Sequence, residues 1–217
     1  MSNVTSLSAW RLYVIIDNAA ARNRDLADIA TQAIHGGADV IQLRDKTAST
    51  RQLIEEATRL LQITRAANIP LIINDRVDIA VAAGADGVHV GQDDLPVSAV
   101  RKVLSPGRIV GKSTHGLEQA RGADREGADY IAVGPIFPTP TKPDYPSVGL
   151  KLISQVKACV NRPIVAIGGI DETTLPDVLA AGAECVAVVR AVCGADDVEQ
   201  AARTLKQLMV EKIPQKS

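Results

Sequence analysis

A seven-residue pattern recurs four times in this chain of 217 residues and sets the spacing of its secondary structure. Each copy begins with Gly-Ala and an acidic residue and continues with mainly apolar residues; the copies span 37–43, 84–90, 127–133 and 182–188. A glycine suited to end a helix, followed directly by a short apolar run, predicts a helix-to-strand junction. The leading glycines are 47, 43 and 55 residues apart. Because one strand–helix unit takes roughly 25 to 30 residues, each interval has room for two units.

Four more apolar runs supply the strands that these intervals require, at 12–16, 70–74, 108–113 and 163–167. Helical segments fill the gaps, at 25–35, 49–67, 77–83, 96–104, 117–126, 150–160, 173–181 and 196–212, and the second of them opens with a Ser49–Gln52 capping box. Eight strands alternating with helices indicate the α/β fold class and predict a single (β/α)8 TIM barrel with parallel strands. No G-x-G-x-x-G turn follows the first strand, which argues against a Rossmann fold. We expect one TIM-barrel catalytic domain over 1–217, with short flexible ends at about 1–9 and 213–217.

The composition fits this fold and excludes several classes of partner. Hydrophobic residues make up 46% of the chain but aromatic ones only 2%, so the core is aliphatic, as suits a parallel sheet. The net charge of -1 provides no overall field for nucleic acid or membrane. The three cysteines lack metal-site spacing, and Cys185 lies in an apolar run typical of a buried core. The run at 12–16 is too short for a signal peptide or a membrane span, so we expect a cytoplasmic protein.

Polar residues and glycines follow almost every predicted strand, at 42–46, 74–76, 91–94, 113–115, 134–142, 168–169 and 189–190. The C-terminal ends of the strands in such a barrel meet at one rim, where its active sites lie. We therefore expect one shared active site at this rim, in preference to scattered solvated loops.

The alternation of side chains along a strand indicates which residues enter the barrel mouth. Gln42 and Arg44 point to one face of their strand, and Ile41 and Leu43 to the other. In all four repeat copies the second face carries only Val, Ile or Leu, as packing against helices requires. Gln42 and Arg44 are thus expected inside the mouth, where a buried arginine needs an anionic partner.

Two groups of residues at the rim are suited to bind phosphate. Three cations, Arg44, Lys46 and Lys142, are expected near Asp75 and Asp94. Cations and carboxylates together suit a diphosphate bridged by Mg2+, although a salt-bridge network that closes the barrel top is the alternative.

The second group is Gly168-Gly169 with the end of the eighth strand, where many such barrels hold a phosphate monoester on backbone N–H groups. A simple turn is the alternative here. One diphosphate site and one monophosphate site together predict a transfer between two phosphorylated substrates.

Other catalytic devices are missing from the sequence. There is no Ser-His-Asp spacing, no zinc motif and no lysine with the parity of a Schiff base, since Lys112 points opposite to Ser113. His35 is interpreted as a helix-end residue and His89 as a packed core histidine. His115 is close enough to the mouth to remain a candidate.

At this point the motifs at 42–46, 74–78, 87–94, 113–115 and 134–142 together resemble the thiamine-phosphate synthase family, over essentially the whole chain. The resemblance implies that hydroxymethylpyrimidine diphosphate alkylates a thiazole phosphate, giving thiamine phosphate and pyrophosphate. It implies a dissociative reaction with Mg2+ as cofactor, in which Arg44, Lys46 and Lys142 stabilise the departing charge and no general base is needed.

The resemblance also implies a role for each matching residue. The pyrimidine diphosphate would be held by Gln42, Leu43, Arg44, Asp45, Lys46, Asn74, Ser113 and Lys142. The metal ligands would be Asp75 and Asp94. The thiazole phosphate would be held by Thr139, Pro140, Thr141, Gly169, Val189 and Arg190.

Two positions depart from the family pattern, which usually has Ser at Arg190 and a small apolar residue at Lys112. Arg190 could add a charged hydrogen bond to the phosphate from the loop after its strand, or crowd it. The alternatives are a thiazole tautomerase relative, a non-catalytic ligand-binding regulator on the same fold, and a sugar-phosphate epimerase. The expected partners are the two small-molecule substrates, with no nucleic acid and no membrane; a homodimer is left open.

Overall fold

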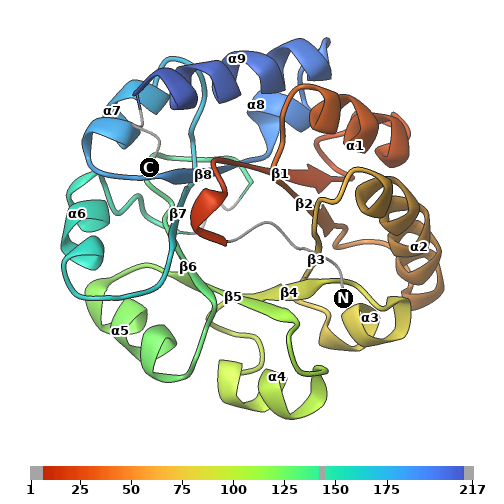
Figure 1. Ribbon diagram of the computed structural model, residues 1–217, viewed down its shortest axis with the longest axis horizontal. Helices are drawn as coiled ribbons and strands as arrows, with labels where there is room; N and C mark the ends of the chain where they lie inside the picture. Colours follow the sequence, from red (N-terminus) through yellow and green to blue (C-terminus); the bar gives the residue numbers. More distant parts are fainter. Residues whose placement is uncertain (1–6, 142–144, 213–217) are drawn as a thin grey trace.

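The chain folds into a closed barrel of eight parallel strands, in which each strand pairs with its neighbours in sequence and β8 returns to β1. The computed structural model describes residues 7–141 and 145–212. The strands are β1 (Leu12–Asp17), β2 (Val40–Arg44), β3 (Leu71–Asn74), β4 (Gly87–Val90), β5 (Ile109–Thr114), β6 (Tyr130–Val133), β7 (Ile164–Ile167) and β8 (Cys185–Val188). The predicted (β/α)8 barrel is confirmed, and Figure 1 shows the strands as a ring surrounded by helices.

The helices follow the predicted segments closely. They are α1 (Leu26–His35), α2 (Thr50–Ala66), α3 (Val77–Ala83), α4 (Val97–Val103), α5 (Leu117–Arg125), α6 (Lys151–Lys157), α7 (Leu175–Ala180), α8 (Arg190–Cys193) and α9 (Val198–Lys212). Ser49 caps α2 and completes the predicted capping box with Gln52. None of the helices within the described ranges is long and apolar enough to cross a membrane.

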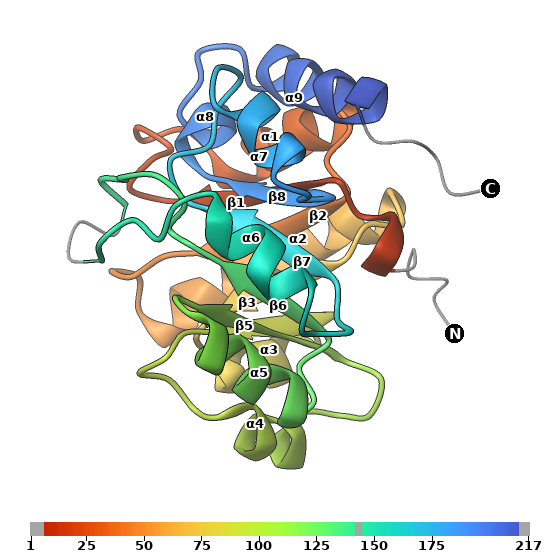
Figure 2. The same ribbon diagram turned by 90° about the vertical axis from the view of Figure 1, so that its left-hand side faces the viewer.

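Two short elements were not predicted. One is α8, which begins at Arg190 directly after β8. The other is a 3-10 helix, η1 (Leu7–Ala9), which lies at the N-terminal end of the barrel, at the right in Figure 2. It falls within the expected flexible start at about 1–9, most of which lies outside the described residues, as does 213–217.

Two separate cores result from the alternation of side chains along the strands. The larger lies between the barrel and the helices and contains residues such as Ile41, Leu43 and Val88. The smaller lies inside the barrel and includes Tyr13 and Tyr130. This inner core contains Cys185 as well, which confirms the prediction that this cysteine is a buried apolar residue.

Each copy of the repeat forms a helix-to-strand junction, as predicted. Its leading glycine has a left-handed backbone, with φ of 100°, 69°, 85° and 100° at Gly37, Gly84, Gly127 and Gly182. A side chain at any of these positions would strain the backbone, so glycine is required where the chain turns from helix into strand.

The acidic residue of the repeat connects each junction to the neighbouring strand. We call Asp39, Asp86 and Asp129 the carboxylate clamps. The carboxylate of each accepts the backbone N–H of one residue in the preceding strand, and the backbone N–H of the aspartate donates to the carbonyl oxygen of that same strand residue. For Asp86 the partner is Leu71, the first residue of β3, with 3.0 Å for both bonds. For Asp129 it is Val110 in β5, at 2.7 and 2.8 Å. The clamps therefore join β1 to β2, β3 to β4 and β5 to β6.

A cation neutralises each clamp. Lys206 reaches Asp39 at 2.5 Å, Arg108 reaches Asp86 at 3.3 Å, and Arg101 reaches Asp129 at 2.6 Å. In the fourth copy Glu184 takes the acidic position and pairs with Lys157 at 3.0 Å. In three of the four copies the acidic residue thus bonds strand backbone at the N-terminal end of the barrel.

We expect Asp86→Ala to lower the free energy of unfolding by about 1.5–3 kcal/mol, because it removes a charged acceptor from the buried N–H of Leu71. Urea unfolding measures this loss. The control is Asp78→Ala, which breaks an exposed pair with Arg76 and should change stability by less than about 1 kcal/mol. Equal losses in the two variants would contradict the role of the clamp.

Candidate active site

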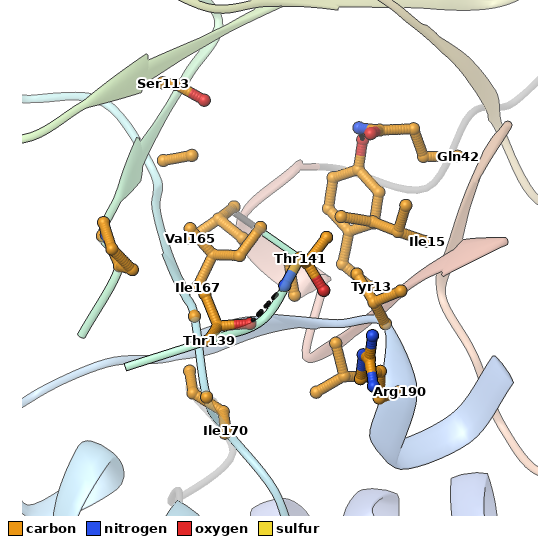
Figure 3. A pocket seen from close by; sticks show the side chains of 18 of the residues that line it. Tyr13, Ile15, Gln42, Ser113, Thr139, Thr141, Val165, Ile167, Ile170 and Arg190 are labelled. Atoms are coloured by element: carbon orange, nitrogen blue, oxygen red, sulfur yellow. Dashed lines mark hydrogen bonds between the residues drawn. The ribbon is translucent and has the colours of Figure 1, made fainter. Parts of the chain in front are cut away.

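A cavity of about 450 Å³ opens at the C-terminal ends of the strands, the end of the barrel where the sequence predicts the active site. Figure 3 shows side chains from several strands converging on it. Ten of the predicted substrate-binding residues line it: Gln42, Arg44, Asn74, Ser113, Thr139, Pro140, Thr141, Gly169, Val189 and Arg190. The structure thus brings together residues that are almost 150 positions apart in sequence (190 against 42).

Arg44 enters the cavity from the end of β2 and forms an ion pair with Asp17, the last residue of β1. The two residues face each other because β1 and β2 pair in register at this point. The Asp17 side chain is only 4% exposed and its other oxygen accepts the N–H of Ala20 at 3.0 Å. Asp17 is therefore the anionic partner that a buried Arg44 requires, and it holds the guanidinium at the cavity wall.

Asp75 follows β3 in a left-handed conformation, with φ of 60°, which is uncommon outside glycine but tolerated by aspartate. Its carboxylate bonds Lys46 and accepts the Asn74 amide at 2.7 Å. Burial acts to raise the pKa of Asp75, but the hydrogen bonds from Lys46 and Asp94 outweigh it and lower that pKa. This carboxylate is consequently ionised over the physiological pH range.

Asp94 lies against Asp75 from the loop after β4. Burial raises the pKa of Asp94, and the Asp75 carboxylate raises it further against the opposing N–H of Gly91, which Asp94 accepts at 2.7 Å. Two carboxylates in contact repel one another when both are ionised, so the pair favours a proton or a cation between them.

No group of three or more His, Cys, Asp or Glu residues in the described parts of the chain could hold a metal ion. A pair of carboxylates nevertheless suits Mg2+, which uses one or two such ligands and completes its shell with water and phosphate oxygens.

Lys112 supports the Asp94 loop from outside the cavity. Its ammonium donates to the carbonyl oxygen of Gly91 at 2.6 Å, next to the N–H that Asp94 accepts. Burial lowers the pKa of Lys112. Its position confirms that it points opposite to Ser113, which lines the cavity.

The opposite wall of the cavity combines backbone from β7 and β8 with the segment after β6. Gly168 and Gly169 have φ of 102° and 65°, and a Cβ on either would lie within 2.5–2.7 Å of Pro135 or Phe137. Glycine is therefore needed for this close approach, and the backbone that follows β7 lines the cavity.

Arg190 lies on the same wall as the first residue of α8, not in a loop as expected. Its side chain is among those that line the cavity, as Figure 3 shows. The Thr139 hydroxyl accepts the N–H of Thr141 at 3.3 Å. Within the described residues the Arg190 guanidinium forms no hydrogen bond or ion pair, so it is available to a ligand.

The floor of the cavity is formed by polar side chains of the barrel interior. His89 is buried, as predicted, yet it also lines the cavity together with Tyr13 and Tyr130. His115 lies at the side of the mouth, where it bonds the carbonyl oxygen of Gly134 and its ring is 4.6 Å from that of Tyr145. His35 ends α1 at 3.9 Å from Glu199, in agreement with a structural role.

Four predicted substrate-binding residues are not among the described residues that line the cavity. One of them, Lys46, bonds Asp75 instead. Leu43 packs in the core between barrel and helices, as its parity predicts. Asp45 caps its own loop, accepting the N–H groups of Thr47 and Ala48 at 2.8 and 3.0 Å. Lys142 lies outside the described residues.

The sequence analysis missed Asp17, Tyr13 and Tyr130. Their signal was present, because each lies on a strand with the parity of inward-facing residues, such as Ile15 on β1. The alternation along β1 places Asp17 on the inward face beside Arg44, where it is the anionic partner that this arginine requires.

Comparison with known proteins gives consistent results. A family model described as thiamine monophosphate synthase matches residues 12–192. A thiamine-phosphate synthase of Chloroflexus aurantiacus is 50% identical over 208 residues, which cover 95% of this chain and 96% of that protein. A thiamine-phosphate synthase of Shouchella clausii is 46% identical over 206 residues, covering 94% of this chain and 99% of that protein.

Solved structures are similar as well. Thiamine phosphate pyrophosphorylase from Pyrococcus furiosus superposes with a TM-score of 0.88 at 36% identity, covering 96% of this chain and 99% of that one. A 3-hexulose-6-phosphate synthase, with a TM-score of 0.64 at 22% identity over 91% of this chain and 98% of that one, shares the fold alone.

We expect Arg44→Ala to destabilise the protein by about 3 kcal/mol at pH 7, because it leaves the buried Asp17 carboxylate without its cation. The double variant Arg44→Ala/Asp17→Asn should recover at least half of the loss, since the amide oxygen can still accept the Ala20 N–H without a buried charge. Urea unfolding of both variants measures the coupling. A double variant no more stable than Arg44→Ala would show that the two residues act independently.

Proposed function

This chain belongs to the thiamine monophosphate synthase family, and we propose that it couples hydroxymethylpyrimidine diphosphate with a thiazole phosphate to give thiamine phosphate and pyrophosphate. It is accordingly a transferase of thiamine biosynthesis. The family pattern extends from the first strand to α8, so we treat the chain as one catalytic domain.

The observation that carries the proposal is a pair of walls, both suited to bind anions, at one mouth of the barrel. The first wall has Arg44, which lines the cavity; Lys46 and the two carboxylates follow the ends of β2 to β4 and are not among the lining residues. Gly169 and Arg190 come from the ends of β7 and β8. In a closed ring of eight strands β3 lies opposite β7, so the two walls face each other across the mouth. Two phosphorylated substrates bound on these walls would present their rings to one another.

The proposed reaction breaks the bond between the pyrimidine methylene carbon and the diphosphate oxygen. The electron pair leaves with pyrophosphate, and the lone pair of the thiazole nitrogen forms the new carbon–nitrogen bond, so the positive charge ends on the thiazolium ring. No proton is transferred, which agrees with a site built without a nucleophile. Arg44, Lys46 and Lys142 would act by stabilising the departing negative charge.

The cavity lining would also protect the cationic pyrimidine. Ile15, Val165, Ile167 and Ala187 contribute apolar surface to the cavity beside the polar side chains of its floor. Such a lining disfavours water, which would otherwise compete with the thiazole nitrogen for the methylene carbon.

We propose Mg2+ as the cofactor and Asp75 and Asp94 as its protein ligands. Their hard oxygen donors and their mutual contact fit this ion. When bound, Mg2+ would withdraw electron density from the diphosphate and so assist its departure.

We expect Asp75→Ala and Asp94→Ala each to lower turnover by several orders of magnitude, because each removes a proposed metal ligand whose contribution to the transition state is several kcal/mol. Product formation from the two heterocyclic phosphates measures turnover, and calorimetry with Mg2+ and pyrophosphate measures metal binding. Retention of most of the wild-type rate in either variant at saturating Mg2+ would refute the assignment.

A matched control is Asp93→Ala, since Asp93 neighbours Asp94 in sequence but its carboxylate accepts the Tyr145 hydroxyl at 3.1 Å. This variant should keep most of the rate and bind Mg2+ normally. A loss as large as that of Asp94→Ala would indicate that general negative charge, and not a specific ligand, is what matters.

We expect Arg190→Ser to raise KM for the thiazole phosphate about ten-fold or more, because a charged hydrogen bond contributes roughly 1.5–3 kcal/mol. KM for the pyrimidine diphosphate should change little, which serves as the internal control. An unchanged KM for the thiazole phosphate would place Arg190 among the surface charges.

We further propose that the enzyme acts in the cytoplasm on small molecules, without nucleic-acid or membrane partners. The near-neutral net charge of -1 and the free cysteines, two of them buried, support this proposal.

A further inference from the structure

We propose that a polarised chain of hydrogen bonds across the cavity floor, formed by Gln42, Tyr13, Tyr130, His89 and Ser113, positions two polar groups that select an amino-substituted pyrimidine ring. The inference rests on the proposed function for the identity of the ring. It goes beyond that function by assigning the selection to three positioning residues, Tyr13, Tyr130 and His89, which have no part in binding phosphate.

The chain of hydrogen bonds is continuous through the barrel interior. The Gln42 amide donates to the Tyr13 hydroxyl at 2.7 Å, and the two tyrosine hydroxyls are 2.9 Å apart. The Tyr130 hydroxyl is 2.9 Å from Nδ1 of His89, whose Nε2 is 2.8 Å from the Ser113 hydroxyl. The chain of hydrogen bonds thus connects β2, β1, β6, β4 and β5, and not all of these strands are neighbours in the barrel. Figure 3 shows Tyr13 and Gln42 meeting on one side of the cavity and Ser113 on the other.

The donor and acceptor roles in this chain of hydrogen bonds follow from its Gln42 end. The amide nitrogen of Gln42 can only donate, so the Tyr13 oxygen accepts from it. Within the described residues the Tyr13 hydroxyl has one other partner, Tyr130, and its proton is therefore directed there. Tyr130 in turn donates to Nδ1 of His89.

The direction of the hydrogen bond at the Ser113 end follows from the tautomer of His89. With Nδ1 accepting, the neutral imidazole of His89 carries its proton on Nε2 and donates to Ser113. The Ser113 hydroxyl proton is then directed to the cavity. At the opposite end Gln42 retains its carbonyl oxygen and a second N–H.

The residues packed around Tyr13 and Tyr130 hold the two rings in these positions. Gly111 lies beneath the Tyr130 ring, where a Cβ would come within 2.1 Å of the ring carbon that carries the hydroxyl. Trp10 packs edge-on against both rings, with centroids 6.0 and 5.7 Å away. Burial raises the pKa of both tyrosines, so they stay neutral and can relay a hydrogen bond.

The two ends of the chain offer a specific pattern to a ligand. Gln42 presents an acceptor beside a donor, and Ser113 presents a donor across the floor. A ring that bears an amine beside one ring nitrogen and has a second ring nitrogen opposite complements all three groups. Because an unpaired buried polar group is costly, a ring without the amine would bind less well.

The experiment measures the dissociation constants of hydroxymethylpyrimidine diphosphate and of inorganic pyrophosphate by calorimetry. Tyr130→Phe removes one oxygen and keeps the ring. We expect it to weaken binding of the pyrimidine diphosphate about ten-fold, because the chain is broken and Ser113 loses its fixed polarity. Pyrophosphate, which has no ring, should bind with an unchanged constant.

Variants of His89 test the polarity directly. His89→Gln can still donate an N–H toward Ser113 and should retain most of the affinity for the pyrimidine diphosphate. His89→Leu cannot donate and should lose about ten-fold. The packing control is Trp10→Phe, which disturbs the support of both rings and leaves the chain atoms in place; we expect it to lower Tm while both dissociation constants stay within about two-fold.

Three outcomes would overturn the proposal: Tyr130→Phe with unchanged pyrimidine affinity, equal weakening of both ligands, or Trp10→Phe matching Tyr130→Phe. Failure of the proposed function looks different. In that case the wild-type protein itself would bind pyrophosphate but not the pyrimidine diphosphate.

Discussion

The carboxylate clamps are the interaction on which the rest of the structure depends. Asp39, Asp86 and Asp129 each hold both backbone groups of one residue at the beginning of a strand, and so fix the register of three strand pairs. A shift of one residue would turn every inward-facing side chain of a strand outward. The clamps lie at the opposite end of the barrel from the cavity, yet they determine which side chains enter it.

The same register explains the electrostatics of the mouth. Asp17 and Arg44 end adjacent strands and meet because β1 and β2 pair residue for residue. Asp75 and Asp94 follow β3 and β4, which are also neighbours. Charges that would be unfavourable alone in a barrel interior thus occur in contact pairs. Asp17 and Arg44 are of opposite sign, and Asp75 and Asp94 are of like sign. In the pair of like sign Lys46 neutralises only one of the two charges, so a further cation would stabilise the pair.

Much of the fold could be predicted because its signals are local. The capping box at Ser49 and the left-handed glycines each act within a few residues, so the sequence alone locates helix ends and strand starts. The helix α8 was missed because its four residues are too few for a periodic pattern, and Arg190 was therefore placed in a loop. Gln42 and Arg44 were placed correctly because the alternation of a strand is also a local rule.

Contacts between distant strands could not be predicted in this way. Tyr13 and Tyr130 are 117 residues apart and meet only because Gly111 leaves space for the second ring. Three of the five aromatic residues of the chain, Trp10, Tyr13 and Tyr130, gather in the inner core, where hydrogen-bonded polar atoms cross it.

That gathering reconciles two demands on the cavity. The proposed cationic pyrimidine would require an interior without water, whereas recognition of its ring would require polar groups in the same interior. A chain in which each hydroxyl accepts one hydrogen bond and donates the next satisfies its own polar atoms and leaves free only the groups at its ends, Gln42 and Ser113. An apolar floor would pack as well and could not distinguish one ring from another. Specificity for the substrate is the role we propose for the polar chain, while the clamps and the two cores account for the stability of the barrel.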